Sequence, residues 1–281
     1  EDGDENPTEF IVYHSARNGN TDVYLLNLDT LEETRVTFYP GIDRYAEISP
    51  DGTQIVFESE RVDRFDRFVL FILDLATGEL TQLDIPGDSY AGTWSPDGSQ
   101  IAYYAHDERE VYQLFVYDLA TQQSTQITTG TINHYVPGWR GDGNALVSIA
   151  NESNISRFTA ESDITRFSNI HVTDISTGIS EQVLDTPDWD SRVSYSPNDR
   201  YILHVSGPYA SDDVFVFDTV TENSYRWMDS VDLNTDPAWS PDGKYIIFVS
   251  NRAGEETDLY IMDRGGNNVR LLYADAGEIS E

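Results

Sequence analysis

Short apolar segments recur along the chain and are separated by polar turns. In the last complete unit, residues 245–249 are a continuous run of aromatic and β-branched residues, which is typical of a buried strand. Residues 258–263 alternate polar and apolar positions, as a half-buried strand does. A short apolar segment at 237–240 precedes these two strands, and residues 269–273 follow them after a Gly-Gly turn. The pattern predicts units of four strands, named A to D in chain order, and no helix with a clear period and caps.

A turn sequence marks the junction between strands A and B. Trp-Ser-Pro-Asp-Gly occupies residues 239–243 and recurs at 94–98, and degraded copies begin at Ile48, Trp139 and Tyr195. Proline fixes φ and Asp-Gly favours the tight turn of a hairpin. Copies of a turn spaced as these are, with strands between them, are typical of propellers. The sheets of a propeller bury both faces by packing against neighbouring sheets.

The units number six, and the sequence predicts an all-β, six-bladed β-propeller of four-stranded antiparallel blades. Residues 1–9 read as an acidic N-terminal linker remnant, and residues 10–281 as a single propeller. The predicted blades are 10–43 with 277–281, 44–89, 90–134, 135–190, 191–234 and 235–276. Because the first unit lacks strand A and residues 277–280 resemble 46–49, we expect the C-terminal strand to complete blade 1 and close the ring. A tail outside the ring is the alternative.

These repeats resemble the WD40-like PD40 repeats of the TolB-type six-bladed propellers. The resemblance covers nearly all of residues 10–281 and is carried by the Trp-Ser-Pro-Asp-Gly box and by Asp-Leu-Tyr at 258–260. The fourth unit departs from it, because it lacks the Ser-Pro and carries an insertion. The resemblance implies the fold, a tendency to bind proteins and a periplasmic or extracellular location. It does not name the ligand, because one fold hosts many functions.

The net charge of the chain restricts the classes of molecule that it can bind. The formal net charge is −33, with one lysine (Lys244) and sixteen arginines, so nucleic acid is excluded as a direct partner and anionic membranes are disfavoured. No apolar run is long enough to insert into a membrane. The acidity is consistent with a halophilic protein, an exported protein kept soluble by charge, or binding of cations such as calcium, although no EF-hand loop is present. The absence of cysteine excludes disulfides and thiol chemistry.

The geometry of a blade divides the acids into two groups. The A–B and C–D turns share one rim of the ring, where the acids that recur from unit to unit are expected to be structural. At the A–B turns these acids are Asp51, Asp97, Asp142 and Asp242, and at the C–D turns they are Asp29, Asp74, Asp118, Asp174, Asp218 and Asp263.

The opposite rim varies from unit to unit, and variation on a rigid scaffold is where specificity usually lies. The residues that enter strand A are expected to place aromatic, arginine and acidic side chains around one mouth of the channel. The predicted ligand- or partner-binding residues are Arg44, Tyr45, Tyr90, His134, Tyr135, Trp189, Arg192 and Asp236. The alternative is that the tyrosines only separate adjacent blades.

Two further segments are candidates for partner contact. The insertion at 151–166 is polar and long enough to form a lid or contact loop over this mouth. The segment 61–67 is rich in arginine and could receive a carboxylate, although local pairing of its arginines with aspartates is the simpler interpretation.

No catalytic signature was found. Gly-x-Ser-x-Gly is absent, the Asp-Gly turns lack the spacing of sialidase boxes, and the five histidines show no ligand spacing. A carboxylate pair among fifty acids stays open. The sequence therefore favours a monomeric, non-catalytic propeller that binds a protein or peptide at the channel mouth and needs no cofactor. The alternatives are a carbohydrate-binding or carbohydrate-cleaving propeller, and a structural propeller domain of a larger receptor or peptidase.

Overall fold

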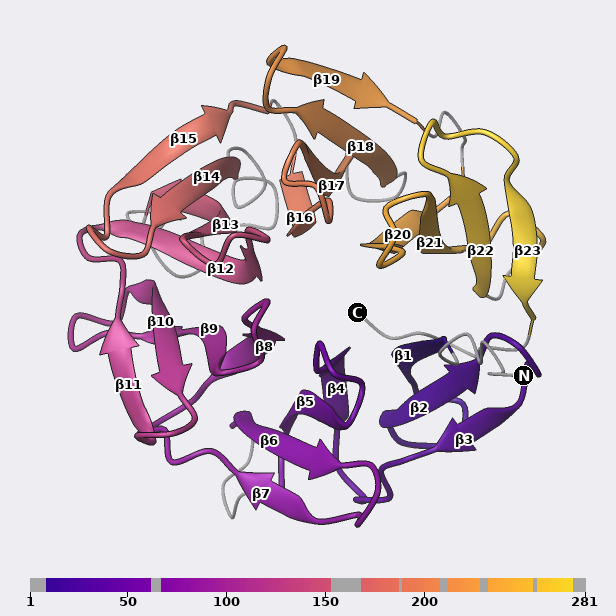
Figure 1. Cartoon of the computed structure of the whole chain (residues 1–281), viewed down its shortest axis with the longest axis horizontal. Coiled ribbons are helices and arrows are strands. Elements are labelled where there is room, and N and C mark those ends of the chain that lie inside the picture. Colours follow the sequence, from indigo (N-terminus) through magenta and orange to yellow (C-terminus); the bar gives the residue numbers. More distant parts are fainter. Residues whose placement is uncertain are drawn as a thin grey trace, which may run out of the picture.

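The computed structural model describes residues 9–61, 67–152, 168–186, 189–207, 212–227, 232–254 and 257–274, with the backbone alone at residue 189. Within these ranges the chain forms strands and turns and no helix. The strands make six antiparallel sheets that stand around a central axis as the blades of a propeller (Figure 1). The predicted all-β, six-bladed propeller is confirmed.

Each blade takes its strands from one continuous stretch of sequence. Blade 1 contains β1 (Phe10–Ser15), β2 (Asp22–Asn27) and β3 (Glu33–Arg35); blade 2 contains β4 (Asp43–Ile48), β5 (Gln54–Ser59), β6 (Val69–Asp74) and β7 (Leu80–Gln82); blade 3 contains β8 (Tyr90–Trp94), β9 (Gln100–His106), β10 (Tyr112–Asp118) and β11 (Gln123–Gln126); blade 4 contains β12 (Ile132–Trp139), β13 (Ala145–Glu152), β14 (Asn169–Asp174) and β15 (Ser180–Leu184); blade 5 contains β16 (Trp189–Tyr195), β17 (Tyr201–Gly207), β18 (Asp213–Asp218) and β19 (Asn223–Arg226); and blade 6 contains β20 (Asn234–Trp239), β21 (Tyr245–Ser250), β22 (Asp258–Asp263) and β23 (Arg270–Tyr273).

The strand order within blades 2 to 6 follows the sequence from the axis outward, as the order A to D predicts (Figure 1). Blade 1 has three strands within the described residues. The strand predicted to complete it, at 277–281, lies outside the described residues. Blades 1 and 6 nevertheless pack directly on each other, because Tyr24 and Leu26 of blade 1 share a buried cluster with Val249 and Leu259 of blade 6.

The core lies between blades rather than within them. One buried cluster joins Val56 and Leu70 of blade 2 to Ile101 and Tyr103 of blade 3, and the other neighbours are joined in the same way. A single blade could not bury these faces alone, which is why the ring is the stable unit.

The repeated tryptophan links blades 3 and 4 each to the blade before it. The indole Nε1–H of Trp94 donates to the backbone oxygen of Glu47 at 3.2 Å, and that of Trp139 donates to the backbone oxygen of Thr93 at 3.1 Å. Both rings are buried. The tryptophan of the repeat therefore serves the packing of blade on blade, whereas the Pro-Asp-Gly that follows it serves the turn.

The carboxylates of the A–B turns accept hydrogen bonds from residues of their own turns. Asp97 Oδ1 accepts hydrogen bonds from the Ser95 hydroxyl and from the backbone N–H and hydroxyl of Ser99. The same pattern surrounds Asp51 and Asp242, and Asn198 replaces aspartate in blade 5. The structural role predicted for these acids is confirmed.

The acids at the ends of strand C behave alike, with one correction. Asp74 Oδ1, for example, accepts from the backbone N–H groups of Ala76 and Thr77. In blade 1 the equivalent acceptor is Asn27, whose side chain accepts from the backbone of Asp29 and Thr30, so the prediction that Asp29 itself fills this position was wrong. An asparagine oxygen accepts these bonds as well as a carboxylate does, so the recurring acid is not obligatory.

The five inner strands of blades 2 to 6 each carry a β-bulge of one extra residue. The bulge contains a residue with positive φ, which is uncommon outside glycine. These residues are Tyr45 (φ 50°), Ala91 (46°), Val136 (47°), Arg192 (49°) and Asp236 (48°). None is glycine, and three of them carry the polar or aromatic side chains predicted for the mouth. Bulges re-aim side chains beside functional sites, and here they turn the same position of every blade.

Candidate functional site

The bulges of opposite blades meet across the channel. The guanidinium of Arg192 in blade 5 lies 4.3 Å from the ring centroid of Tyr45 in blade 2, and these blades face each other across the ring in Figure 1. On the same ring the Arg44 guanidinium lies 4.9 Å from the centroid, and His14 of blade 1 lies 5.7 Å away. The Tyr45 ring thus contacts two cations, and the contact with Arg192 spans the channel at the level of the bulges.

Both arginines are neutralised by acids. Arg192 forms an ion pair with Asp236 of blade 6, and Arg44 Nε donates to Glu58 Oε1 at 2.6 Å. The other Glu58 oxygen accepts from the backbone N–H of Ala91, in the bulge of blade 3, at 2.9 Å. Two hydrogen-bonded sets, one from blades 2 and 3 and one from blades 5 and 6, are thereby joined through the contact of Arg192 with the Tyr45 ring.

The pKa values of Asp236 and Glu58 are shifted in opposite directions. Burial by itself raises the pKa of Asp236, but the charge and hydrogen bond of Arg192 outweigh it, so that the pKa lies below its ordinary value. Burial also raises the pKa of Glu58, and there Arg44 offsets the effect only in part, so that the pKa lies above its ordinary value. Glu58 is 1% exposed, and its carboxylate is the more deeply desolvated of the two.

A tyrosine cluster occupies the neighbouring part of the mouth. Tyr90 stacks on Tyr104 with ring centroids 5.2 Å apart, and Tyr104 meets the ring of Tyr135 edge to face at 5.6 Å. Tyr112 contacts all three of these rings. His106 stacks on Tyr112 at 3.8 Å. The four tyrosines are partly exposed and come from the inner three strands of blade 3 and the inner strand of blade 4.

The hydroxyls of Tyr90, Tyr104 and Tyr135 are protonated at neutral pH. Burial raises the pKa of Tyr135 to about 12, with a smaller contribution from Tyr112. Burial also raises the pKa of Tyr90 and Tyr104. These rings can therefore offer hydroxyl donors and aromatic faces to a ligand.

Most of the predicted mouth residues are brought together. Arg44, Tyr45, Arg192 and Asp236 form the ionic group, and Tyr90 and Tyr135 belong to the tyrosine cluster. Sequence reasoning missed Glu58, Tyr104 and Tyr112. The available signal was their place at the same end of strands B and C as the entry to strand A, one strand farther from the axis for Glu58 and Tyr104 and two for Tyr112.

One predicted residue, His134, does not join this group. The structure places His134 inside blade 4, where it is 2% exposed, its Nδ1 lies 3.1 Å from the Ser148 hydroxyl, and its ring meets that of His171. Burial lowers the pKa of His134 to about 4, so it is neutral and belongs to the interior of the blade. Trp189 opens β16, and its side chain lies outside the described residues.

The two additional segments are described only at their ends. Residues 153–167 of the insertion lie outside the described residues, so its predicted role as a lid stays a prediction. Of the segment 61–67, Arg61 pairs with Asp43 at 2.5 Å and Arg67 pairs with Asp88. Pairing of arginine with nearby aspartate is confirmed for these two residues.

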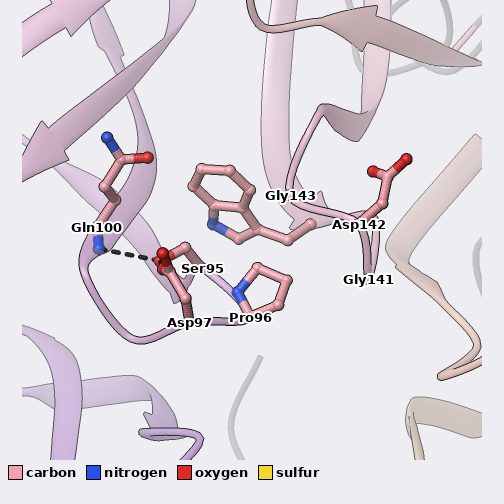
Figure 2. A pocket seen from close by; sticks show the side chains of 8 residues that line it. Ser95, Pro96, Asp97, Gln100, Gly141, Asp142 and Gly143 are labelled. Carbon is pink, nitrogen blue, oxygen red and sulfur yellow. Dashed lines mark hydrogen bonds between the residues drawn. The ribbon is translucent and has the colours of Figure 1, made fainter.

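A shallow pocket lies on the turn rim, between the A–B turns of blades 3 and 4. It is lined by Ser95, Pro96, Asp97, Gln100, Trp139, Gly141, Asp142 and Gly143 (Figure 2). The polar groups of blade 3 there are already paired, because Ser95 Oγ accepts from the Gln100 backbone N–H at 2.9 Å and Asp97 holds its own turn. This pocket is a by-product of the turns and offers few free groups to a ligand.

Within the described part of the chain, no three His, Cys, Asp or Glu side chains lie close enough together to hold a metal ion. Calcium binding stays a prediction. The same residues include no helix that is long and apolar enough to cross a membrane.

The fold is a six-bladed β-propeller, and its channel mouth carries arginine, acidic and tyrosine side chains from separate blades. A family model described as the TolB beta propeller domain, PD40, matches residues 158–280. The Tol-Pal system protein TolB of Francisella tularensis is 28% identical over 198 residues, which cover 69% of this chain and 45% of that protein. The matched region thus spans less than half the length of that relative.

Solved structures show the same fold. A putative TolB from Agrobacterium tumefaciens superposes with a TM-score of 0.75 at 20% identity and covers 94% of this chain and 89% of that one. An oligogalacturonate lyase in complex with manganese reaches a TM-score of 0.62 at 20% identity, covering 95% and 72%. The predicted resemblance to the TolB-type six-bladed propellers with PD40 repeats is confirmed.

Proposed function

We propose that this protein is a non-catalytic binding module that holds a protein or peptide partner at the channel mouth. The observation that carries the proposal is the gathering of Arg44, Tyr45, Tyr90, Arg192 and Asp236 from separate blades around the axis. Tyrosine and arginine are the residue types that most often anchor protein interfaces. The sequence relatives are named as proteins of the Tol-Pal system, which supports a protein partner and an exported, periplasmic location.

The mouth is built for recognition more than for chemistry. Its acids, Glu58 and Asp236, are each committed to an arginine, and its tyrosine hydroxyls remain protonated. A general base needs a free proton acceptor within reach of substrate. Committed acids and rigid aromatic rings instead provide a preorganised surface, which reduces the entropy lost on binding.

The test removes the cross-channel group without changing net charge. The variant carries Tyr45→Leu, Arg192→Gln and Asp236→Asn, and is compared with wild type as bait in pull-downs from the source organism's extract. We expect partners captured by wild type to be lost from this variant.

The matched control removes an ion pair of the same type from the turn rim. Arg140 and Asp142 pair at 2.8 Å in blade 4, and Arg140→Gln with Asp142→Asn also preserves net charge. Blade 5 carries Asn198 at the position of Asp142, so the turn accepts this change. We expect the control to capture the same partners as wild type. Equal capture by wild type and the mouth variant would place the binding surface elsewhere.

A carbohydrate ligand is the second candidate. It is favoured by the partly exposed tyrosine rings, which can stack on sugars, and by the fold shared with an oligogalacturonate lyase. A glycan array probed with wild type and the mouth variant tests it. Glycan binding lost only in the variant would favour this candidate over a protein partner.

A further inference from the structure

Two aromatic rings at the mouth, Tyr45 and Phe68, already contact arginine side chains. Arg192 and Arg44 lie over Tyr45, and Arg44 also lies 4.1 Å from the ring centroid of Phe68. Phe68 in turn contacts Tyr90, with ring centroids 6.2 Å apart. The protein's own arginines therefore show which kind of group these rings accept.

The tyrosine cluster next to these rings differs from them in its contacts with cations. Across the described ranges no arginine or lysine lies over Tyr90, Tyr104 or Tyr135, although all three rings are partly exposed. Aromatic faces are electron-rich and attract guanidinium and ammonium groups, most strongly where water is excluded.

The electrostatics around this cluster favour a cation. Arg44 is paired with Glu58 and Arg67 with Asp88, and the charges of both acids act on the Tyr90 hydroxyl. After burial, the negative charges of Asp88 and Glu58 further raise the pKa of Tyr90, and Arg44 opposes them only in part. The whole chain carries a net charge of −33, which repels acidic partners and attracts basic ones.

We propose that Tyr90, Tyr104 and Tyr135 form a subsite for a guanidinium or ammonium group on a basic segment of the peptide or protein partner. The inference rests on the proposed function and names the ligand chemistry of that same mouth. An arginine side chain fits best, because its planar group can lie on one ring while its N–H groups reach tyrosine hydroxyls or the carboxylates beside them.

The test uses a tetra-arginine peptide and its tetra-citrulline counterpart, which has nearly the same shape without the charge. Fluorescence anisotropy at physiological and at high salt measures the Kd of each peptide for wild type. Because net charge alone attracts tetra-arginine, the variants must leave it unchanged. Tyr90→Leu with Tyr135→Leu removes two rings, Tyr90→Phe with Tyr135→Phe keeps them, and Tyr225→Leu removes an equally uncharged tyrosine that is 46% exposed on outer strand β19.

We expect the leucine pair to weaken tetra-arginine binding about 10-fold, since two cation–π contacts are together worth about 1–2 kcal/mol. The phenylalanine pair should stay within about 3-fold of wild type because the ring faces remain. Tyr225→Leu should bind as wild type does, and tetra-citrulline should bind at least about 10-fold more weakly than tetra-arginine.

Equal tetra-arginine affinity in wild type and the leucine pair would overturn the proposal, because the peptide would then be held by diffuse charge. Tight binding of a tetra-glutamate peptide at the mouth would overturn it as well. If the leucine pair does not fold, as thermal melting would show, the single Tyr90→Leu and Tyr135→Leu variants give the same comparison. If partner capture is lost with the variant of Tyr45, Arg192 and Asp236 but survives the leucine pair, the cation subsite fails while the mouth assignment stands.

Discussion

The turn rim and the mouth rim use the same residue types in opposite ways. On the turn rim, Asp97 and its counterparts accept hydrogen bonds from residues two positions away, and the arrangement repeats from blade to blade. At the mouth, the residue at the bulge position differs in each of blades 2 to 6, and Arg192 and Glu58 find partners in other blades. Residues that repeat satisfy their own turn, whereas residues that vary interact across the ring.

The two rims therefore contribute differently to stability and to binding. A repeated turn contributes to every blade alike and leaves nothing unusual on the surface. A varied bulge places dissimilar side chains together at positive φ, a conformation that costs about 1–2 kcal/mol for a non-glycine residue. We therefore expect substitutions near the turns to change stability most, and substitutions at the mouth to change binding most.

The largest effect is expected where the turn box ties blades together. Trp139→Ala should lower the free energy of unfolding by about 3–5 kcal/mol, since it removes a buried ring and the hydrogen bond to Thr93. Urea unfolding measures the loss. Trp239→Ala is the comparison, because Trp239 is more exposed and its Nε1 has no hydrogen-bond partner. Equal losses at the two positions would contradict the role given to the indole hydrogen bond.

An intermediate, pH-dependent effect is expected at Glu47, the one acid beside the repeated anchor. Burial raises its pKa to about 7, although hydrogen bonds from Thr93 and from the Trp94 backbone oppose the shift. The folded state therefore holds a proton that the unfolded chain has already released. Stability from this group is complete below the unfolded pKa of 4.5 and is lost as pH rises to about 7.

Glu47→Gln removes that loss, because the amide stays neutral and can still accept from Trp94. We expect the difference in unfolding free energy between variant and wild type to grow by about 2 kcal/mol from pH 5 to pH 8. Denaturant unfolding at both pH values measures it. A constant difference would show that Glu47 is ionised throughout.

The smallest effect is expected within a single turn. Asp97→Ala should reduce stability by about 1 kcal/mol, because the backbone and hydroxyl of Ser99 lose their acceptor. Asp97→Asn should change it less, since Asn198 fills the same position in blade 5. Thermal melting distinguishes the two variants. A loss as large in Asp97→Asn as in Asp97→Ala would mean that the charge, rather than the acceptor, holds the turn.

Much of the fold could be predicted because its signals are local. The Pro-Asp-Gly turns and the alternation within Asp258–Asp263 depend on residues a few positions apart, and the structure confirms both. The mouth was predicted less completely. Tyr104 and Tyr112 lie on strands that read as ordinary buried strands, and no local pattern distinguishes them from core residues. His134 matched the sequence position of the mouth residues, yet the strand directs it into blade 4.

The sequence by itself determined the number of blades, the order of their strands and the structural use of the turn acids, because hydrogen bonds between near neighbours and the strand period are properties of short segments. Only the tertiary structure decided that Arg192 meets Tyr45 and that four tyrosines gather beside Arg44 and Glu58. The contact of Arg192 with Tyr45 joins blades 2 and 5, which are far apart in the chain and meet because the blades stand in a ring. The tyrosines come from the adjacent blades 3 and 4 and meet where these blades pack together. The bulge contributes the rest, because one extra residue changes the direction of a side chain without leaving a recognisable sequence of its own.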